Sequence, residues 1–335
     1  MQKKLIAMAV GATIAAAPFV AAQADVKLWG RLEVELVNID GGKFDNYTQQ
    51  GDANGMSRFG IDASKDLGNG LKAIGRYAFK MDPSNGADDS ARDQWVGLKG
   101  GFGAFQIGRL PAHYKMTGGV KWDPYTATFM EARRSGGMSG DALGHNGFLN
   151  DVISYASPKL GPVAFTLGYI ADETPLGEAA DGTPNGALNG TFTGGISGNF
   201  GPVEVIGAYT NANRSSLSDI KQGKVGVRYK GNGLTAALQY EDVDNVGSIR
   251  VNGNRVAGPK SGKITFANLG YKFGNTLIAG NYGKTDADNN QGDVDYAAIG
   301  ATYFLAKKVR AYVGYAVTES DNKYNMYGAG MRYDF

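Results

Sequence analysis

The stretch that decides the fold is Val26-Lys27-Leu28-Trp29-Gly30-Arg31-Leu32-Glu33-Val34-Glu35-Leu36. One face of this stretch is apolar apart from Gly30 and carries Val26, Leu28, Leu32, Val34 and Leu36. The other face carries charged side chains and one indole: Lys27, Trp29, Arg31, Glu33 and Glu35. Successive side chains of a strand point to opposite faces, so this alternation predicts a β-strand with one apolar and one polar face.

The same alternation recurs to the end of the chain. It is clear in 71–80 and 163–171, and again in 234–241 and 325–335. We therefore expect an all-β protein with about sixteen strands, near residues 26–39, 56–66, 71–81, 91–99, 103–109, 151–157, 163–171, 191–200, 203–210, 221–230, 234–243, 261–273, 276–285, 293–305, 309–319 and 325–335.

The connections between these segments alternate in length. Short turns such as Gly231-Asn232-Gly233 are followed by long polar stretches such as 40–55 and 172–190. Short turns on one rim and long loops on the other are the layout of transmembrane β-barrels. Two soluble sandwiches or a propeller are the alternatives, but a sandwich disfavours inward charges, and no blade-length repeat is found. An antiparallel barrel is favoured, because only closure pairs every backbone group in lipid.

The N-terminus has the features of an export signal. Lys3 and Lys4 precede an uncharged run from Leu5 to Ala22, and Ala22-Gln23-Ala24 offers a small-x-small cleavage site. A retained membrane helix is the alternative, but Pro18 within the run favours cleavage. We expect residues 1–24 to be a signal peptide and residues 25–335 to be the exported barrel.

Composition narrows the class of protein. The chain has 34 basic and 32 acidic residues, and the two signs balance once Lys3 and Lys4 are set aside, so nothing indicates nucleic acid as a partner. The absence of cysteine excludes disulfides, thiolate metal sites and thiol nucleophiles. Fifty-one glycines together with 33 tyrosines and phenylalanines fit a curved sheet with aromatic girdles better than a disordered linker.

Several segments resemble the Gram-negative general porins, especially proteobacterial diffusion porins of the Neisserial type. The sharpest is Gln94-Trp95-Val96-Gly97-Leu98-Lys99-Gly100-Gly101-Phe102-Gly103-Ala104-Phe105-Gln106-Ile107-Gly108-Arg109. Val26 to Arg31, Arg58-Phe59-Gly60, Leu67 to Ala73 and the ending Tyr333-Asp334-Phe335 agree with the same family. The alternating aromatics Tyr333 and Phe335 also resemble the terminal signal that the outer-membrane assembly machinery reads.

The resemblance implies a sixteen-stranded barrel in the outer membrane of a Gram-negative bacterium, in contact with lipid and usually a homotrimer. It also implies that a long loop after the fifth strand, here 110–150, bends into the lumen and narrows it. Long irregular segments of compact proteins are often functional. The Pro-Glu-Phe-Gly-Gly-Asp motif that enterobacterial porins carry in this loop is absent here.

The charges that line the narrowest part of a pore set its selectivity. Strand parity places Arg31, Arg58, Lys72 and Arg76 on the lumen side, and the resemblance adds Arg109, which together predict a basic wall. Asp123, Glu131 and Asp141 are the candidate acids of the loop. Arg133 and Arg134 could instead make the constriction basic from both sides and favour anions. All of these could also be ordinary lumen charges.

The function predicted is passive diffusion of small hydrophilic solutes and ions. A substrate-selective channel stays open because of Tyr114, Trp122 and Tyr125, and a structural or adhesive barrel is a third possibility. An enzyme is not expected, because the only histidines, His113 and His145, lie in the long loop, where we expect them to face solvent. No cofactor or metal is expected either: the calcium-like start at Asp286 has Ala297 where a calcium loop has glutamate.

Overall fold

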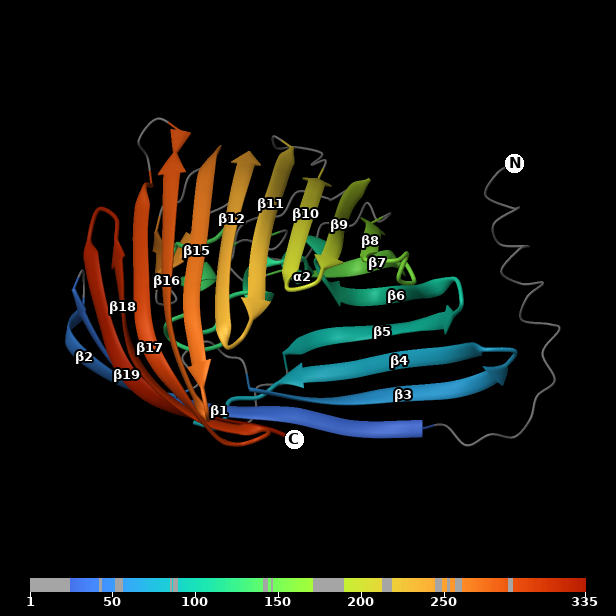
Figure 1. Cartoon of the computed structure of the whole chain (residues 1–335), viewed down its shortest axis with the longest axis horizontal. Helices are drawn as coiled ribbons and strands as arrows, with labels where there is room; N and C mark the ends of the chain where they lie inside the picture. The colour runs from blue at the N-terminus through green and yellow to red at the C-terminus, as the bar shows by residue number, and fades with distance from the viewer. Residues whose placement is uncertain are drawn as a thin grey trace.

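The computed structural model describes residues 25–41, 44–51, 57–84, 86, 90–140, 144–145, 147–170, 190–212, 219–244, 249–251, 254–256, 261–288 and 292–335. The expected signal peptide 1–24 and Asp141 lie outside these residues. Apart from one separate hairpin, the described strands form one antiparallel sheet that closes on itself, because the last strand pairs with the first (Figure 1).

The first part of the wall is formed by β1 (Asp25–Gly41), β2 (Phe44–Gly51), β3 (Arg58–Gly68), β4 (Leu71–Lys80), β5 (Ala91–Gly100) and β6 (Gly103–Pro111). Three short helices follow: α2 (His113–Met116), η1 (Gly119–Lys121) and η2 (Ala132–Arg134). The wall continues with β7 (Phe148–Ala156), β8 (Val163–Ile170), β9 (Thr191–Phe200), β10 (Val203–Ala212), β11 (Ile220–Gly231) and β12 (Leu234–Asp244). It is completed by β15 (Ser261–Phe273), β16 (Thr276–Ala287), β17 (Val294–Ala306), β18 (Val309–Glu319) and β19 (Lys323–Asp334).

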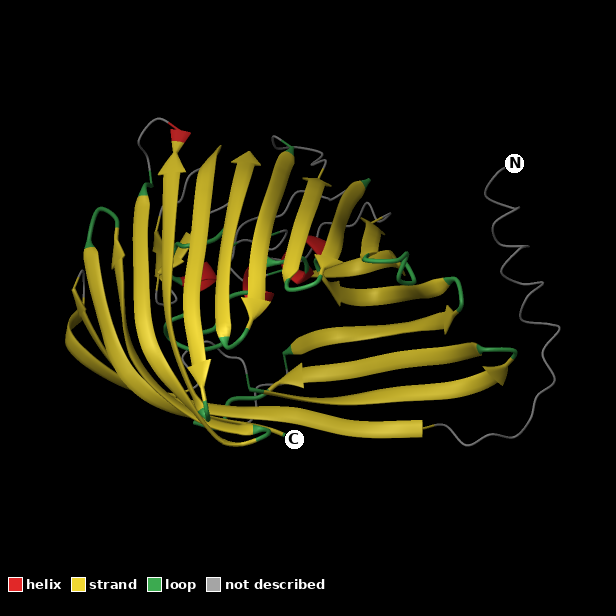
Figure 2. Cartoon of the chain, in the orientation of Figure 1, coloured by secondary structure: helices red, strands yellow, loops and turns green. Residues whose placement is uncertain are grey.

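Within the described residues the wall has sixteen strand positions, which confirms the predicted barrel. β2 and β3 share one position, because both pair with β1, β2 near its end and β3 near its start. Every other wall strand pairs with its neighbours along the chain (Figure 2). Two details differ from the prediction: β2 lies in the stretch expected to be a loop, and β13 (Ile249–Val251) with β14 (Asn254–Val256) forms a separate hairpin in another.

The two faces of the wall differ as the alternation predicted. The outward face exposes aliphatic and aromatic side chains, among them Val96, Ile107, Ile196, Leu238, Leu269, Ile299 and Val313. The inward face buries polar side chains, among them Glu33, Glu35, Thr210, Gln222, Gln239, Glu241, Asn268 and Asn281. No helix of the described chain is long and apolar enough to cross a membrane. An apolar outer face with a polar interior is the arrangement of a barrel dissolved in lipid.

Two tight turns are formed by Asn-Gly pairs. Asn69 and Gly70 have φ values of 51° and 75°, and Asn232 and Gly233 have φ values of 52° and 81°. Two-residue hairpins need positive φ at both central positions, which glycine and asparagine adopt at low cost. These pairs therefore fix the hairpins β3–β4 and β11–β12.

The described residues between Pro111 and Phe148 (112–140, 144–145 and 147), called the inner loop below, lie against the inward face of the wall. The backbone N–H of Phe129 donates to Glu35 Oε2 of β1 over 2.8 Å, and the Tyr114 hydroxyl donates to Glu241 Oε2 of β12 over 2.8 Å. These two carboxylates belong to the buried polar face, so the inner loop lies within the barrel. It includes α2, η1 and η2, which Figure 2 shows in red inside the ring of strands.

Apolar packing fixes the middle of the inner loop on the same wall. Its buried Tyr125, Phe129, Met130 and Met138 pack with side chains of β15 to β19: Phe266, Tyr296, Tyr312, Ala316 and Met326. The Tyr125 hydroxyl donates to the carbonyls of Ala279 and Gly300, and the Tyr296 hydroxyl donates to the carbonyl of Met130. The inner loop is thus attached to the wall opposite β3 to β6.

If the outward face contacts hydrocarbon, the cost of a charge there will depend on its depth. Ile299 lies near the middle of β17, whereas Leu305 lies on the same face beside the turn at Lys307. Ile299→Arg should destabilise the barrel by about 2–4 kcal/mol, and Leu305→Arg by about 0–1 kcal/mol. Urea unfolding in lipid vesicles measures both, and equal costs at the two depths would contradict this orientation of the wall.

Candidate functional site

The predicted basic wall begins on three neighbouring strands. Arg31 of β1, Arg58 of β3 and Arg76 of β4 all lie on the inward face, and Arg31 and Arg58 are direct partners in the β1–β3 register. Trp29 lies between two of them: the guanidinium carbons of Arg58 and Arg76 are 5.8 Å and 4.8 Å from its ring centroid. The structure therefore brings these three arginines together.

Two of the three arginines carry compensated charges. Arg76 donates two hydrogen bonds to Asp62, over 2.7 Å and 2.8 Å, and a third to Asp93 over 3.3 Å. Arg31 donates to Asp334 over 2.8 Å. Arg58 makes no ion pair with any other described residue, although it is only half-buried. Arg58 is therefore an uncompensated cation of this wall.

Arg92 joins this group, and the sequence analysis missed it. Counting alternate positions back from the exposed Val96 puts Arg92 on the outward face. The β4–β5 register shifts between Tyr77 and Phe79, so two residues of β5 oppose one residue of β4. This β-bulge re-aims Arg92, which is only 7% exposed and has Asp93, Arg133 and Arg31 among its electrostatic neighbours.

Two predicted basic residues lie apart from Arg31, Arg58 and Arg76. Lys72 is exposed beside the β3–β4 turn, opposite Lys99 and Asp66, and is not among the electrostatic neighbours of Arg58 or Arg92. Arg109, at the end of β6, donates to Asn150 Oδ1 over 2.5 Å and lies against the ring of Phe148. The structure therefore places Lys72 at a rim of the barrel and Arg109 at the base of the inner loop.

The described candidate acids of the loop, Asp123 and Glu131, are buried. An acidic side of a constriction would need carboxylates that are exposed to the lumen. Asp123 is 5% exposed, accepts hydrogen bonds from the N–H groups of Tyr125 and Ala132, and is bonded by Asn281 of β16 over 2.7 Å. Burial and the neighbouring Glu131 raise the pKa of Asp123 to about 6. Glu131 is fully buried and accepts from Arg133 over 2.5 Å. Both carboxylates stabilise the inner loop and are shielded from the open lumen.

The inner loop contributes further cations. Lys115 is 6% exposed, and Arg133 is 2% exposed and also donates to the carbonyl of His145 over 2.8 Å. Arg134 is half-buried. Burial, together with Arg133 and Arg92, lowers the pKa of Lys115 well below its usual value. The alternative of basic residues on both sides of the constriction thus matches the observed positions better than an acidic loop does.

The two histidines were expected to face solvent, and this expectation is wrong. His113 is 7% exposed and shares a 2.9 Å hydrogen bond with Ser154 of β7; burial lowers its pKa to about 4. His145 is fully buried: its Nδ1 donates to the carbonyl of Ser139 over 2.8 Å, and its Nε2 accepts from Lys224 of β11 over 2.9 Å. Burial and Lys224 lower the pKa of His145 well below its usual value. Both neutral imidazoles attach the loop to the wall.

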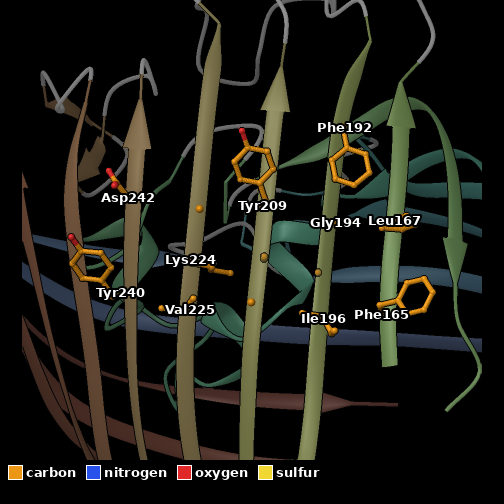
Figure 3. A pocket seen from close by; sticks show the side chains of 14 residues that line it. Phe165, Leu167, Phe192, Gly194, Ile196, Tyr209, Lys224, Val225, Tyr240 and Asp242 are labelled. Atoms are coloured by element: carbon orange, nitrogen blue, oxygen red, sulfur yellow. The ribbon is translucent and has the colours of Figure 1, made fainter. Parts of the chain in front are cut away.

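A surface depression of about 740 Å³ lies elsewhere, over β8 to β12 (Figure 3). Its lining combines glycines with large outward side chains: Phe165, Leu167, Phe192, Gly194, Ile196, Gly207, Tyr209, Gly223, Val225 and Tyr240. These apolar residues belong to the outward face, so the depression is part of the surface that meets lipid. No group of acids and histidines among the described residues could hold a metal ion. The candidate functional site is therefore the group of basic side chains on the inward face of the wall and on the inner loop.

The buried histidines make the attachment of the loop sensitive to pH. A histidine released to water regains a pKa of about 6.5 and takes up a proton below that pH, whereas the buried imidazole does not. The attached state should therefore lose stability as the pH falls below about 6.5. We expect more current fluctuations in single-channel recordings at about pH 5 than at about pH 7.5, and a smaller difference in a His113→Asn, His145→Gln double variant. Equal fluctuation at both pH values in the wild type would show that these histidines do not control the loop.

Comparisons with known proteins agree with this geometry. The family model described as Gram-negative porin matches residues 7–323. The major outer membrane protein P.IB of Neisseria meningitidis serogroup A is 28% identical in an alignment of 367 residues, gaps included, that covers all of both chains. Outer membrane porin protein 32 of Delftia acidovorans is 33% identical over 193 residues, 54% of this chain and 53% of that protein.

Two solved structures share the fold. The anion-selective porin from Comamonas acidovorans superposes with a TM-score of 0.72 at 18% identity, over 93% of this chain and all of its own. Salmonella typhi OmpF gives a TM-score of 0.74 at 17% identity, over 92% of this chain and 97% of its own. The family match spans nearly the whole chain, and the closed barrel with its inward charges is independent support. The chain therefore belongs to the Gram-negative porin family and forms a diffusion channel in the outer membrane.

Proposed function

We propose that this channel admits small hydrophilic solutes by passive diffusion and favours anions over cations. The proposal rests on one observation, namely which charged side chains of the lumen are paired or buried and which are not. Arg58 is a half-buried cation of the wall and makes no ion pair with any other described residue, whereas the loop acids Asp123 and Glu131 are buried. A permeating ion would therefore meet an excess of positive charge where the lumen passes Arg58.

The size of the effect follows from elementary electrostatics. One unit charge about 5 Å from a permeating ion contributes about 0.8 kcal/mol in a water-like medium, which corresponds to roughly fourfold in permeability. Salt screens this interaction over about 10 Å at 0.1 M ionic strength. A few uncompensated cations are thus enough to bias permeation without stopping the flow of water or neutral solutes. The proposed mechanism is size exclusion with a charge bias, without catalysis or energy input.

The assembly state and route of biogenesis are part of the same proposal. We infer that residues 1–24 direct export and are removed, and that Tyr333 and Phe335 are read by the barrel-assembly machinery. A relative of the same fold, Vibrio cholerae OmpT, is described in a trimer form. A homotrimer embedded in outer-membrane lipid is accordingly the proposed working form of this chain.

The direct test is the reversal potential of the purified protein in a planar bilayer under a KCl gradient. We expect the dilute side to become negative, because chloride crosses faster than potassium. Arg58→Gln removes one uncompensated charge and should lower the ratio of chloride to potassium permeability by about two- to fourfold.

Lys72→Gln is the matched control, because it removes the same charge at the rim. Its permeability ratio should stay close to that of the wild type. A dilute side that becomes positive in the wild type would overturn the anion preference. Absence of any conductance from a folded barrel would remove the diffusion channel itself and favour a structural role.

A further inference from the structure

Three cationic side chains surround one aromatic ring at the base of the inner loop. Lys115 Nζ lies 4.2 Å from the centroid of the Phe148 ring, and the guanidinium carbons of Arg92 and Arg109 lie 4.8 Å and 5.7 Å from it. The cations come from α2, from the start of β5 and from the end of β6. Three separate elements thus place a cation near the Phe148 ring.

The hydrogen-bonding capacity of this cluster is only partly used. The Nε atoms of Arg92 and Arg109 are buried and have no hydrogen-bond partner. Lys115 forms no hydrogen bond or ion pair with the rest of the described chain. The nearby carboxylates are already engaged, Asp93 by Arg76 and Glu131 by Arg133. Asp93 is an electrostatic neighbour of all three cations, so the cluster shares one carboxylate that Arg76 also engages, and it keeps unused donors.

The aromatic ring compensates little of this charge. A cation over an aromatic face gains about 0.5–2 kcal/mol, whereas removing a cation from water costs several kcal/mol. Arg92 is also among the positive neighbours that lower the pKa of Lys115. An anion held among them would supply both the missing charge and the missing acceptors.

We propose that Arg92, Lys115 and Arg109 around Phe148 form a binding site for a small oxyanion, of which inorganic phosphate is the representative. An oxyanion offers several acceptor atoms to donors from different directions, and guanidinium groups match such oxygens better than they match a single halide. The site rests on the proposed anion preference and adds to it a discrete, saturable step that precedes permeation.

Lys115 gives the site a second measurable property, which is proton uptake on binding. Burial and the neighbouring Arg133 and Arg92 lower the pKa of this lysine well below its usual value. A bound anion stabilises the protonated amine, so binding is accompanied by proton uptake. The heat of binding should then depend on the ionisation enthalpy of the buffer.

The experiment is a titration of the purified folded protein in a planar bilayer with inorganic phosphate, at constant chloride. We expect the chloride current to fall to a plateau as phosphate occupies the site. Lys115→Met should raise the phosphate concentration for half-maximal block by about tenfold, equivalent to about 1.4 kcal/mol. Arg92→Gln should act in the same direction, and Lys115→Arg should retain most of the block. Calorimetry in two buffers measures the expected proton uptake independently.

Lys121→Met is the matched control, because Lys121 lies in the same loop but has Glu204 and Arg228 as its charged neighbours. Its half-blocking concentration should stay within about twofold of the wild type. A current that does not saturate with phosphate, or an equal effect of Lys115→Met and Lys121→Met, would overturn the site. Reversal potentials in KCl alone separate the two proposals, since a preference for chloride without phosphate block contradicts only the binding site.

Discussion

Every backbone N–H and C=O group inside a bilayer needs a partner within the protein, and the rest of this structure depends on that constraint. It is met because β19 pairs with β1 from Arg31 opposite Asp334 to Asp40 opposite Asn325, which leaves the barrel without an open edge. Closure assigns each strand an outward and an inward face. The outward face then had to be apolar, and the polar face was left to form the lumen.

The attachment of the inner loop to the wall determines which charged side chains line the lumen. The loop covers β9 to β12 and β15 to β18 through buried contacts such as Tyr114 to Glu241 and Asp123 to Asn281. Asp123 is held by such a contact and Glu131 by Arg133 of the same loop, so both of these loop carboxylates are engaged. On the opposite wall, β1 to β5, Arg31 and Arg76 are paired with acids, whereas the half-buried Arg58 has no paired acid in the described chain. On the proposed function, the placement of the charges, and not the overall charge of the chain, gives the channel its preference for anions.

The sequence predicted the wall well because lipid on one side and water on the other impose a period of two on every strand. It did not reveal Arg92, since a β-bulge breaks that period at the point where the residue turns inward. It also led us to expect solvent-facing histidines, which is wrong, and it gave no sign that Asp123 and Glu131 are buried. The burial of these groups depends on partners such as Asn281, 158 residues away from Asp123, and Lys224, 79 residues away from His145. Local patterns carry no signal for contacts of this kind.

The central claim is that a water-filled passage with positive potential runs through the barrel beside Arg58. The chain has no cysteine, so Ser64→Cys introduces a single thiol on the inward face of β3, six residues from Arg58 along the same strand. The most direct measurement compares the rates at which anionic and cationic thiosulfonate reagents of equal size modify this thiol. Our account predicts faster modification by the anionic reagent, measured relative to free cysteine. Faster modification by the cationic reagent, or no modification by either, would contradict it.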